Sequence, residues 1–474
     1  MSDLAVDMCV IGAGAAGLTT AAIAAQLGAR TVLIERAEMG GECLNTGCVP
    51  SKALPAAAKA ALITRISRGF GVTCGEPTVD FAAVHRHVRG VIDVIAPHDS
   101  VERFAGFGVE VIQAEARFVA PRRITAGNHA IRARRVVIAT GSEPVVPPIP
   151  GIDSVPYFTN ETIFDNDQLP RHLLIIGAGP IGIELAQAHR RLGAAVTIIE
   201  ADKAMPKDDP ELAGALLECL AEEGIAIRQT AAIESAEPNG TGIALTVEEN
   251  GGLSRIDGSH LLVAAGRKPR VETLDLDRAG VKYGKQGITV DRRLRTTARG
   301  VYAVGDVVGG PRFTHVAGYH AGIVIRNALF HLPAKVDYAA LPWVTFTGPE
   351  LAQVGLTEAE ARQRYGADIV VIRLPFAEND RAQAERGTGG MIKVVARRNG
   401  HILGASIVGA HAGELSHVWV LAIEQGLKLK YIAGMLAPYP TWGEANKMAA
   451  VEFYKPRLLN PWTRRLVRAL AWLP

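Results

Sequence analysis

The chain has few cysteines and almost no net charge. Five cysteines in 474 residues are too few for a disulfide-stabilised secreted scaffold. A formal net charge of +3 gives no argument for nucleic acid, and no nucleic-acid-binding signature is present. The N-terminus carries Asp3 and Asp7, where a signal peptide would carry basic residues. We therefore expect a cytoplasmic protein without a nucleic-acid partner, in which paired cysteines are more often catalytic than structural.

A long uncharged run near the N-terminus is not the membrane span that its length allows. Residues 8–29 carry no charged side chain and could cross a bilayer. However, Gly12, Gly14 and Gly17 interrupt the run, and its first residues have the pattern of a buried strand. A strand, a glycine turn and a helix fit this segment better.

That segment opens a unit that occurs twice. An apolar strand at 6–11 is followed by a glycine turn at 12–17, a helix to Leu27, a strand at 31–34 and Glu35. The second copy has a strand at 173–176, the turn Gly177, Gly179 and Gly182, a helix at 183–192, a strand at 196–199 and Glu200. Two complete copies indicate two dinucleotide-binding domains of the Rossmann type, and so an α/β fold.

The two copies predict where nucleotides bind. Glycines let backbone N–H groups approach a pyrophosphate, and the helix N-terminus adds a favourable dipole. Glu35 would hold ribose hydroxyls. Glu200 would accept from a free 2′-OH and repel a 2′-phosphate, which favours NADH over NADPH, although Lys203 and Lys207 lie nearby.

The pattern of predicted secondary structure changes after about residue 341. Before it, three further strands lead into glycine turns at 135–141, 260–266 and 300–306, and prolines from 144 to 150 indicate a crossover. After it, segments 344–346, 369–373, 391–395 and 403–408 predict an antiparallel sheet with helices between its strands.

The segment 40–52 (GGECLNTGCVPSK) carries Cys43 and Cys48. Two cysteines five residues apart lie on different faces of a regular helix, so a disulfide here requires a distorted segment, for which Gly47 supplies permissive backbone. Metal binding would need a CxxC pair or a neighbouring histidine, and neither is present, so no metal ligands are predicted. A redox-active disulfide is the better interpretation.

With this segment the chain resembles the class I flavoprotein disulfide reductases, the family of dihydrolipoamide dehydrogenase, glutathione reductase and mercuric reductase. The resemblance covers essentially the whole chain, because further family motifs follow in order. These motifs are Thr140-Gly141, Gly266-Arg267, Val304-Gly-Asp306 and Thr357 after Val354-Gly-Leu.

The resemblance implies two cofactors and a shared active site. FAD would be held by Gly12, Gly14, Gly17, Glu35, Gly41, Thr140, Gly141, Asp306 at the ribitol chain and Thr314 at the flavin pyrimidine. The nicotinamide cofactor would be held by Gly177, Gly179, Gly182, Glu200 and Gly266. Lys52 and Glu184 would form an ion pair beside the flavin. Cys48 would be the thiolate against the flavin, and Cys43 the thiol that meets the acceptor. The family dimer would bring Tyr439 and Glu444 to the cysteines of the other subunit.

Tyr439 departs from the pattern of the disulfide-reducing branch. That branch has a His-Pro-Thr motif with a Glu five residues after the His, whereas this chain has Tyr439-Pro-Thr and Glu444. A tyrosine, with a pKa near 10, is a poor general base at neutral pH. Mercuric reductases carry a tyrosine there, but also a C-terminal cysteine pair, and this chain has no cysteine after Cys219.

The sequence therefore predicts an FAD-dependent NAD(P)H oxidoreductase with an unidentified small-molecule or metal-ion acceptor. Three alternatives remain open: mercuric reductase proper, dihydrolipoamide dehydrogenase, and a non-enzymatic redox sensor. We expect an FAD domain at 1–148 and 269–340, an NAD(P) domain at 149–268, a homodimer-forming α+β domain at 341–456 and a basic amphipathic tail at 457–474. The tail puts Trp462, Leu466, Leu470 and Leu473 on one helical face, which fits either a membrane surface or the dimer.

Overall fold

The computed structural model describes residues 2–472 and divides the chain into two compact units. The first unit comprises the chain up to Ala201 together with Arg228–Val336, and the second comprises Asp202–Ile227 and the chain from Asp337 onwards. The predicted five-part boundaries are finer than this division and stay predictions.

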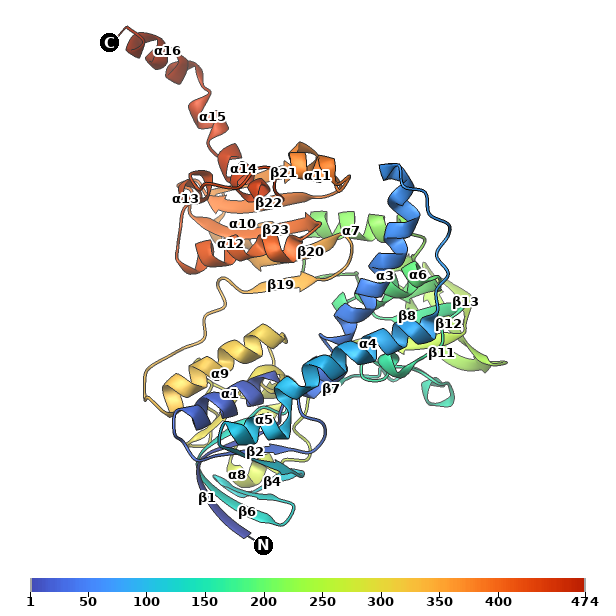
Figure 1. The fold of residues 1–474 in the computed structure, drawn as a ribbon, viewed down its shortest axis with the longest axis vertical. Helices are drawn as coiled ribbons and strands as arrows, with labels where there is room; N and C mark the ends of the chain where they lie inside the picture. The colour runs from blue at the N-terminus through green and yellow to red at the C-terminus, as the bar shows by residue number, and fades with distance from the viewer. Residues whose placement is uncertain (1, 473–474) are drawn as a thin grey trace. The chain divides into compact units, whose positions relative to one another are not determined.

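The first unit is built on a seven-stranded sheet with the order β3-β2-β1-β6-β5-β4, in which β18 also pairs with β6. Strands β1, β2, β3, β6 and β18 run parallel, and their apolar residues are buried from both faces, as parallel strands require. Two helices, α1 and α9, pack side by side on this sheet (Figure 1). The bounds are β1 Ser2–Ile11, β2 Thr31–Glu35, β3 Val109–Gln113, β4 Ala116–Ala120, β5 Arg123–Ala126, β6 His129–Ile138, β18 Val301–Ala303, α1 Ala15–Gln26 and α9 Thr314–Ala328.

A second sheet has the order β10-β9-β8-β14 and carries the second glycine turn. Strand β8 pairs in parallel with β9 and with β14, and a separate three-stranded antiparallel sheet follows in the order β11-β12-β13. The bounds are β8 His172–Ile176, α6 Pro180–Leu192, β9 Ala195–Ile199, β10 Ala226–Arg228, β11 Ala232–Asn239, β12 Gly242–Glu249, β13 Gly252–Gly258 and β14 His260–Val263.

The segment between β2 and β3 is helical and includes the cysteine motif. A short ribbon of β7 and β15 brings residues near 143 beside residues near 268. The bounds are α2 Gly41–Asn45, α3 Pro50–Ile66, α4 Phe81–Ile95, α5 Val101–Gly106, β7 Ser142–Pro144, β15 Arg267–Pro269, α8 Leu276–Ala279, β16 Tyr283–Gly284 and β17 Gly287–Ile288.

The second unit contains the predicted antiparallel sheet, in the order β19-β20-β23-β22-β21. Trp419 and Phe376 are fully buried in its core. The bounds are α7 Pro210–Glu222, β19 Pro342–Thr345, β20 Glu350–Gly355, α10 Glu358–Tyr365, β21 Ile369–Pro375, α11 Asp380–Ala384, β22 Met391–Arg397, β23 Ile402–Gly409, α12 Ala412–Glu424, α13 Leu429–Ala433 and α14 Glu444–Glu452.

The chain ends in two further helices, α15 (Lys455–Leu458) and α16 (Pro461–Leu470). Leu473 of the predicted apolar face lies outside the described residues. Within residues 2–472, no helix has both the length and the apolar composition that crossing a membrane requires.

Candidate functional site

The cysteine segment is not one regular helix, as the five-residue spacing requires. Helix α2 ends at Asn45, Thr46 leaves the helical conformation with φ −139°, and α3 begins at Pro50. Gly47 is required here because it has no side chain, since its φ does not lie in the left-handed region. A Cβ on Gly47 would lie 2.9 Å from the carbonyl oxygen of Glu42, a separation that real Cβ atoms do not adopt.

Both sulfurs meet the first residue of α9. The hydroxyl of Thr314 lies 3.1 Å from Cys48 Sγ and 3.3 Å from Cys43 Sγ, and both cysteines are free thiols. A hydrogen bond from the Cys43 thiol, together with Thr314 and the charge of Lys52, lowers the pKa of Cys48 to about 6. The same hydrogen bond and burial raise the pKa of Cys43. The arrangement makes Cys48 the thiolate and Cys43 the proton donor to it.

This asymmetry predicts a pH dependence for the reduced protein. Because the thiolate is the reactive form, the alkylation rate of Cys48 by iodoacetamide should rise with pH around a midpoint of about 6 and level off above it. The exposed Cys74, outside this contact, serves as the internal reference. Mass spectrometry of the alkylated peptides measures both rates. Equal midpoints for Cys48 and Cys74 would contradict the assignment.

An ion pair lies on the helix that follows the cysteines. Lys52 Nζ on α3 is 2.8 Å from Glu184 Oε2 on α6, and these two helices pack against each other. The Glu184 side chain is only 7% exposed, so its carboxylate needs the lysine as a counter-charge.

The two glycine turns have the same backbone geometry. Gly12 N–H donates to Ile34 at 2.8 Å, and Gly177 N–H donates to Ile199 at 2.9 Å. A Cβ on Gly12 would lie 2.4 Å from a carbonyl oxygen at the end of the neighbouring parallel strand. A Cβ on Gly177 would lie 2.5 Å from the corresponding carbonyl oxygen in the second sheet. Gly17 and Gly182, one turn into each helix, would collide in the same way with the carbonyls of these first glycines.

The middle glycine of each turn faces open space. A Cβ on Gly14 or Gly179 would meet nothing within 4 Å, and each residue is the N-cap of its helix. Two helix N-termini without side chains in front of them fit two pyrophosphates. The chain therefore has room for FAD at the first turn and for a nicotinamide dinucleotide at the second.

The carboxylate of each repeated motif accepts a hydrogen bond from a backbone N–H group of its own glycine turn. Glu35 accepts from Ala13 N–H at 2.6 Å, and Glu200 accepts from Ala178 N–H at 2.8 Å. Each carboxylate thus lies at the end of a parallel strand beside its glycine turn, which is where the ribose of a dinucleotide is held.

Of the other predicted cofactor-binding residues, Gly41 and Thr140 lie against the first glycine turn. A Cβ on Gly41 would lie 2.7 Å from Gly14 Cα, so the cysteine helix packs directly against the first glycine turn. Thr140 Oγ1 donates to Arg270 O at 2.7 Å. Gly141 and Gly266, at the two glycine-ended strands, both have a positive φ.

A polar network that the sequence analysis did not identify connects the cysteine helix to Asp306. Ser142 Oγ donates to Asp306 Oδ2 at 2.6 Å, and Arg267 Nε donates to Ser142 Oγ at 2.8 Å. Arg267 also contacts the carboxylate of Glu42, which accepts from Asn160 at 2.9 Å. Burial outweighs the ion pair with Arg267 and raises the pKa of Glu42 to about 7. Glu42 and Arg267 both stood inside recognised motifs, but their pairing spans 225 residues and has no local signal.

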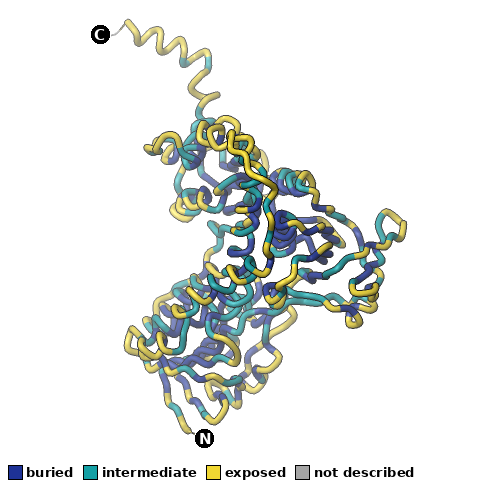
Figure 2. Tube along the Cα trace, turned by 45° about the vertical axis from the view of Figure 1, so that its right-hand side comes forward, coloured by how far each residue is buried: buried dark blue, intermediate teal, exposed yellow. Residues whose placement is uncertain are grey.

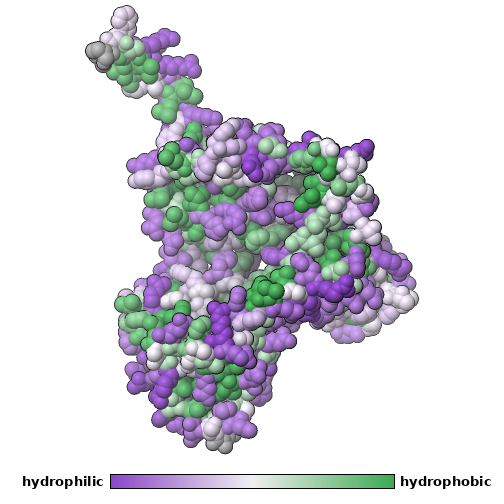
Figure 3. All heavy atoms as spheres, viewed as in Figure 1, coloured by the Kyte–Doolittle hydropathy of each residue, from purple (hydrophilic) through white to green (hydrophobic). Residues whose placement is uncertain are grey.

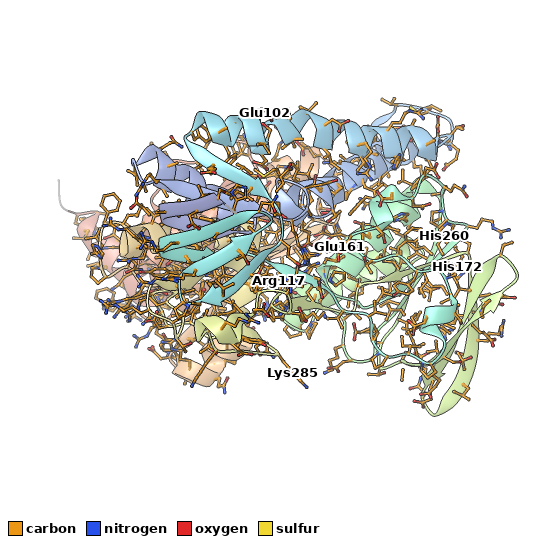
Figure 4. All side chains as sticks on the ribbon, turned by 90° about the horizontal axis from the view of Figure 1, so that it is seen from below. Glu102, Arg117, Glu161, His172, His260 and Lys285 are labelled. Carbon is orange, nitrogen blue, oxygen red and sulfur yellow. The ribbon has the colours of Figure 1, made fainter. Side chains whose placement is uncertain are left out.

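A second ion pair flanks this network. Glu161, labelled in Figure 4, contacts the guanidinium of Arg270, which also pairs with Glu143 at 3.4 Å. These contacts hold the ribbon of β7 and β15 beside the cysteine helix, so that several charged groups surround Glu42.

Tyr439 and Glu444 belong to the second compact unit. The Tyr439 side chain is 69% exposed, and its hydroxyl donates to Asp380 Oδ2 at 2.8 Å. This hydrogen bond raises the pKa of Tyr439, so still less of the basic phenolate form is present at neutral pH. Glu444 begins α14, and its N–H donates to Thr441 Oγ1 at 3.2 Å.

His320 on α9 is buried, accepts from Gly305 N–H at 3.1 Å, and has its pKa lowered to about 4 by burial, which makes it a neutral packing residue. Within residues 2–472, no group of three or more His, Cys, Asp or Glu side chains is arranged to hold a metal ion.

Comparisons with known proteins agree on one family. The profile of the pyridine nucleotide-disulphide oxidoreductases matches residues 6–321, and that of their dimerisation domain matches residues 341–450. Mercuric reductase from Staphylococcus aureus is 35% identical over 452 residues, which cover 95% of this chain and 82% of the relative. Dihydrolipoyl dehydrogenase from Geobacillus stearothermophilus is 35% identical over 456 residues, covering 93% of this chain and 94% of the relative.

A solved structure resembles the chain over nearly its full length. The Cu(II) complex of the HOCl-induced flavoprotein disulfide reductase RclA from Escherichia coli has a TM-score of 0.85 and 29% sequence identity. The match covers 93% of this chain and 99% of that one.

Proposed function

The chain belongs to the pyridine nucleotide-disulphide oxidoreductase family, and on that basis we propose that its Cys43–Cys48 pair delivers electrons from NAD(P)H to a thiophilic metal ion. FAD, when bound, supplies two-electron transfer between the nicotinamide and the cysteines. The Cys48 thiolate and the Cys43 thiol give up two electrons and one proton as they close to a disulfide; the electrons pass to the metal ion and the proton to water.

The observation that carries this proposal is the asymmetric thiol pair. Thr314 and Lys52 favour a thiolate at Cys48, while Cys43 keeps its proton until an acceptor arrives. Lys52 and Glu184 place a positive charge beside the path of the electrons and hold it there. We assign Cys43 as the residue that meets the acceptor, as the family resemblance implies; once it loses its proton it is a thiolate, the ligand type that soft metal ions select.

Tyr439 favours a metal ion over a disulfide as the acceptor. Reducing a disulfide substrate requires a group that moves a proton at neutral pH, and Tyr439 is engaged with Asp380 and has a raised pKa. Relatives named mercuric reductase and the Cu(II) complex of RclA support this direction.

An acceptor screen tests the proposal. NADH oxidation by the purified flavoprotein should depend on Hg(II) or Cu(II), and oxidised lipoamide should support it at least tenfold more weakly. Faster turnover with lipoamide than with either metal ion would replace the proposal with dihydrolipoamide dehydrogenase activity.

Placing at position 439 the histidine that the disulfide-reducing branch carries should increase activity with a disulfide substrate. Tyr439→His should raise turnover with lipoamide by about tenfold to a hundredfold, because the new imidazole can exchange a proton near neutral pH. The matched control is Tyr439→Phe, which removes the hydroxyl without adding a base and should leave lipoamide turnover low. Steady-state kinetics at pH 7 measure both. Unchanged lipoamide turnover in Tyr439→His would show that position 439 does not limit disulfide reduction.

We also propose that NADH is the preferred donor. Glu200 is held beside the second glycine turn, where it accepts from a free 2′-OH and repels a 2′-phosphate. Glu200→Ala should lower the ratio of kcat/KM for NADH to that for NADPH by about tenfold. Glu218→Ala, an exposed acid on α7, is the control and should keep the ratio. An unchanged ratio in Glu200→Ala would remove the basis for preferring NADH.

The family match supports a proposal for the assembly. The chain contains the dimerisation domain of the family, and we propose a homodimer in which Tyr439 and Glu444 approach the cysteines of the second copy. We place the enzyme in the cytoplasm, with peripheral contact to a membrane through the tail.

A further inference from the structure

The last residues of the chain lie beyond the part that matches the family. The dimerisation-domain profile ends at residue 450, and α15 and α16 follow it. Every described residue from Lys455 to Trp472 is exposed except Asn460 and Thr463, which are partly exposed (Figure 2). These helices therefore add a separate surface to the second unit and contribute no residue to its core.

The surface of α16 is sharply divided. Trp462, Leu466 and Leu470 follow one another at four-residue spacing, and they are 70%, 40% and 49% exposed. In Figure 3 hydrophobic side chains of the tail are visible at the surface. At about 100° per residue, Arg464, Arg465 and Arg468 fall on the opposite side of the helix.

The charge of the tail has one sign. Arg457 adds a fourth arginine close to α16, and no acidic residue follows Glu452 in the sequence. An apolar stripe on a globular protein is normally covered by other parts of the chain, whereas this one is not. Arginines along such a stripe match anionic headgroups, and Trp462 at its start is the residue type that prefers the boundary between acyl chains and water.

We propose that α16 docks in the plane of an anionic phospholipid surface, with its apolar stripe inserted at the headgroup boundary and its arginines among the phosphates. Ten residues are too few to cross a bilayer, so the contact is peripheral. In a homodimer two such helices would act together, which increases the avidity of docking. The alternative is that a second copy of this chain covers the apolar stripe of α16. The flotation experiment distinguishes this from docking on a membrane.

Vesicle flotation of the full-length holoenzyme tests the proposal. Vesicles of phosphatidylcholine with 30% phosphatidylglycerol, about the charge of an anionic membrane, should carry the protein to the top of the gradient at low salt. Pure phosphatidylcholine vesicles should bind it far more weakly, and about 0.5 M salt should release it. The triple variant Arg464→Gln/Arg465→Gln/Arg468→Gln should lower the partition coefficient roughly a hundredfold.

Two matched variants keep the result interpretable. Trp462→Ala/Leu466→Ala/Leu470→Ala removes the apolar stripe and should lower binding at least about tenfold. Arg123→Gln/Arg132→Gln/Arg299→Gln removes the same charge from exposed positions elsewhere and should leave binding unchanged. Melting temperature and flavin content confirm that each variant is folded.

Three results would overturn the proposal. Equal flotation of wild type and the Arg464/Arg465/Arg468 variant would exclude the tail as the contact. Equal binding to neutral and anionic vesicles would exclude the charge argument. A shift from dimer to monomer in either tail variant, without any loss of flotation, would assign the stripe to the second copy of the chain.

Discussion

Replacing Cys43 with serine is expected to lower metal-ion-dependent NADH oxidation about a thousandfold or more. Serine cannot close a disulfide with Cys48 and is a poor ligand for a soft metal ion, so under the proposed mechanism the variant loses the group that meets the acceptor. Stopped-flow or steady-state assays with Hg(II) as the acceptor measure the loss of NADH oxidation.

Two controls separate loss of the cysteine from loss of the fold. Cys43→Ser should still oxidise NADH with ferricyanide, a one-electron acceptor that needs no thiol. Cys74→Ser and Cys219→Ser, at an exposed and a partly exposed cysteine, should keep the full metal-dependent rate. Comparable Hg(II)-dependent rates in wild type and Cys43→Ser would show that Cys43 is not the exit for electrons.

Replacing Lys393 with methionine is expected to destabilise the second unit by about 3–5 kcal/mol. The Lys393 side chain is 4% exposed, and its Nζ lies 2.8 Å from Asp209, Glu211 and Glu358. Asp209 is 1% exposed, so without the lysine it would be a buried charge with no cation. Arg373 pairs with Glu211 and Glu358 at the edge of the cluster and cannot take the place of Lys393.

The pH dependence of that effect has a definite sign. Hydrogen bonds from Arg373 and Lys393 lower the pKa of Glu211 to about 2, below its unfolded value of about 4.3. Stability from this group is therefore present above pH 4.3 and is lost as the pH falls toward 2. The difference between wild type and Lys393→Met should accordingly stay constant from pH 7 down to about 4.3 and shrink as the pH falls from there toward 2.

Urea unfolding, monitored by tryptophan fluorescence, measures the free energy of unfolding of each variant and its dependence on pH. Lys428→Met, at an exposed lysine outside the cluster, should be close to neutral. Adding Asp209→Leu to Lys393→Met should recover part of the lost stability, because an apolar pair avoids the uncompensated charge. A loss below about 1 kcal/mol for Lys393→Met would mean that water reaches the carboxylates.

The sequence predicted those parts of the fold and site that depend on local patterns. Both glycine turns were predictable because a missing Cβ, an apolar strand and an acid occur at fixed spacing. The broken helix at the cysteines followed from their five-residue separation alone. The antiparallel sheet after residue 341 followed from alternating apolar strands.

The rest depends on contacts between residues far apart in the chain. Thr314 was expected at the flavin pyrimidine, and the structure shows its hydroxyl beside both sulfurs, 266 and 271 residues away in sequence. The buried cluster of Lys393 joins residues 184 positions apart. Asp380 holds the Tyr439 hydroxyl across 59 positions. No spacing rule connects such pairs, because folding and not periodicity brings them together.

Anaerobic titration of the purified yellow protein with NADH, followed by absorbance, tests most directly whether the cysteine pair lies in the electron path. The account predicts a long-wavelength absorbance band from the Cys48 thiolate next to the flavin, which Cys48→Ser abolishes and which fades as the pH falls below about 6. Simple bleaching of the flavin, identical in wild type and Cys48→Ser, would contradict the account and move the search to acceptors that take electrons without the thiols.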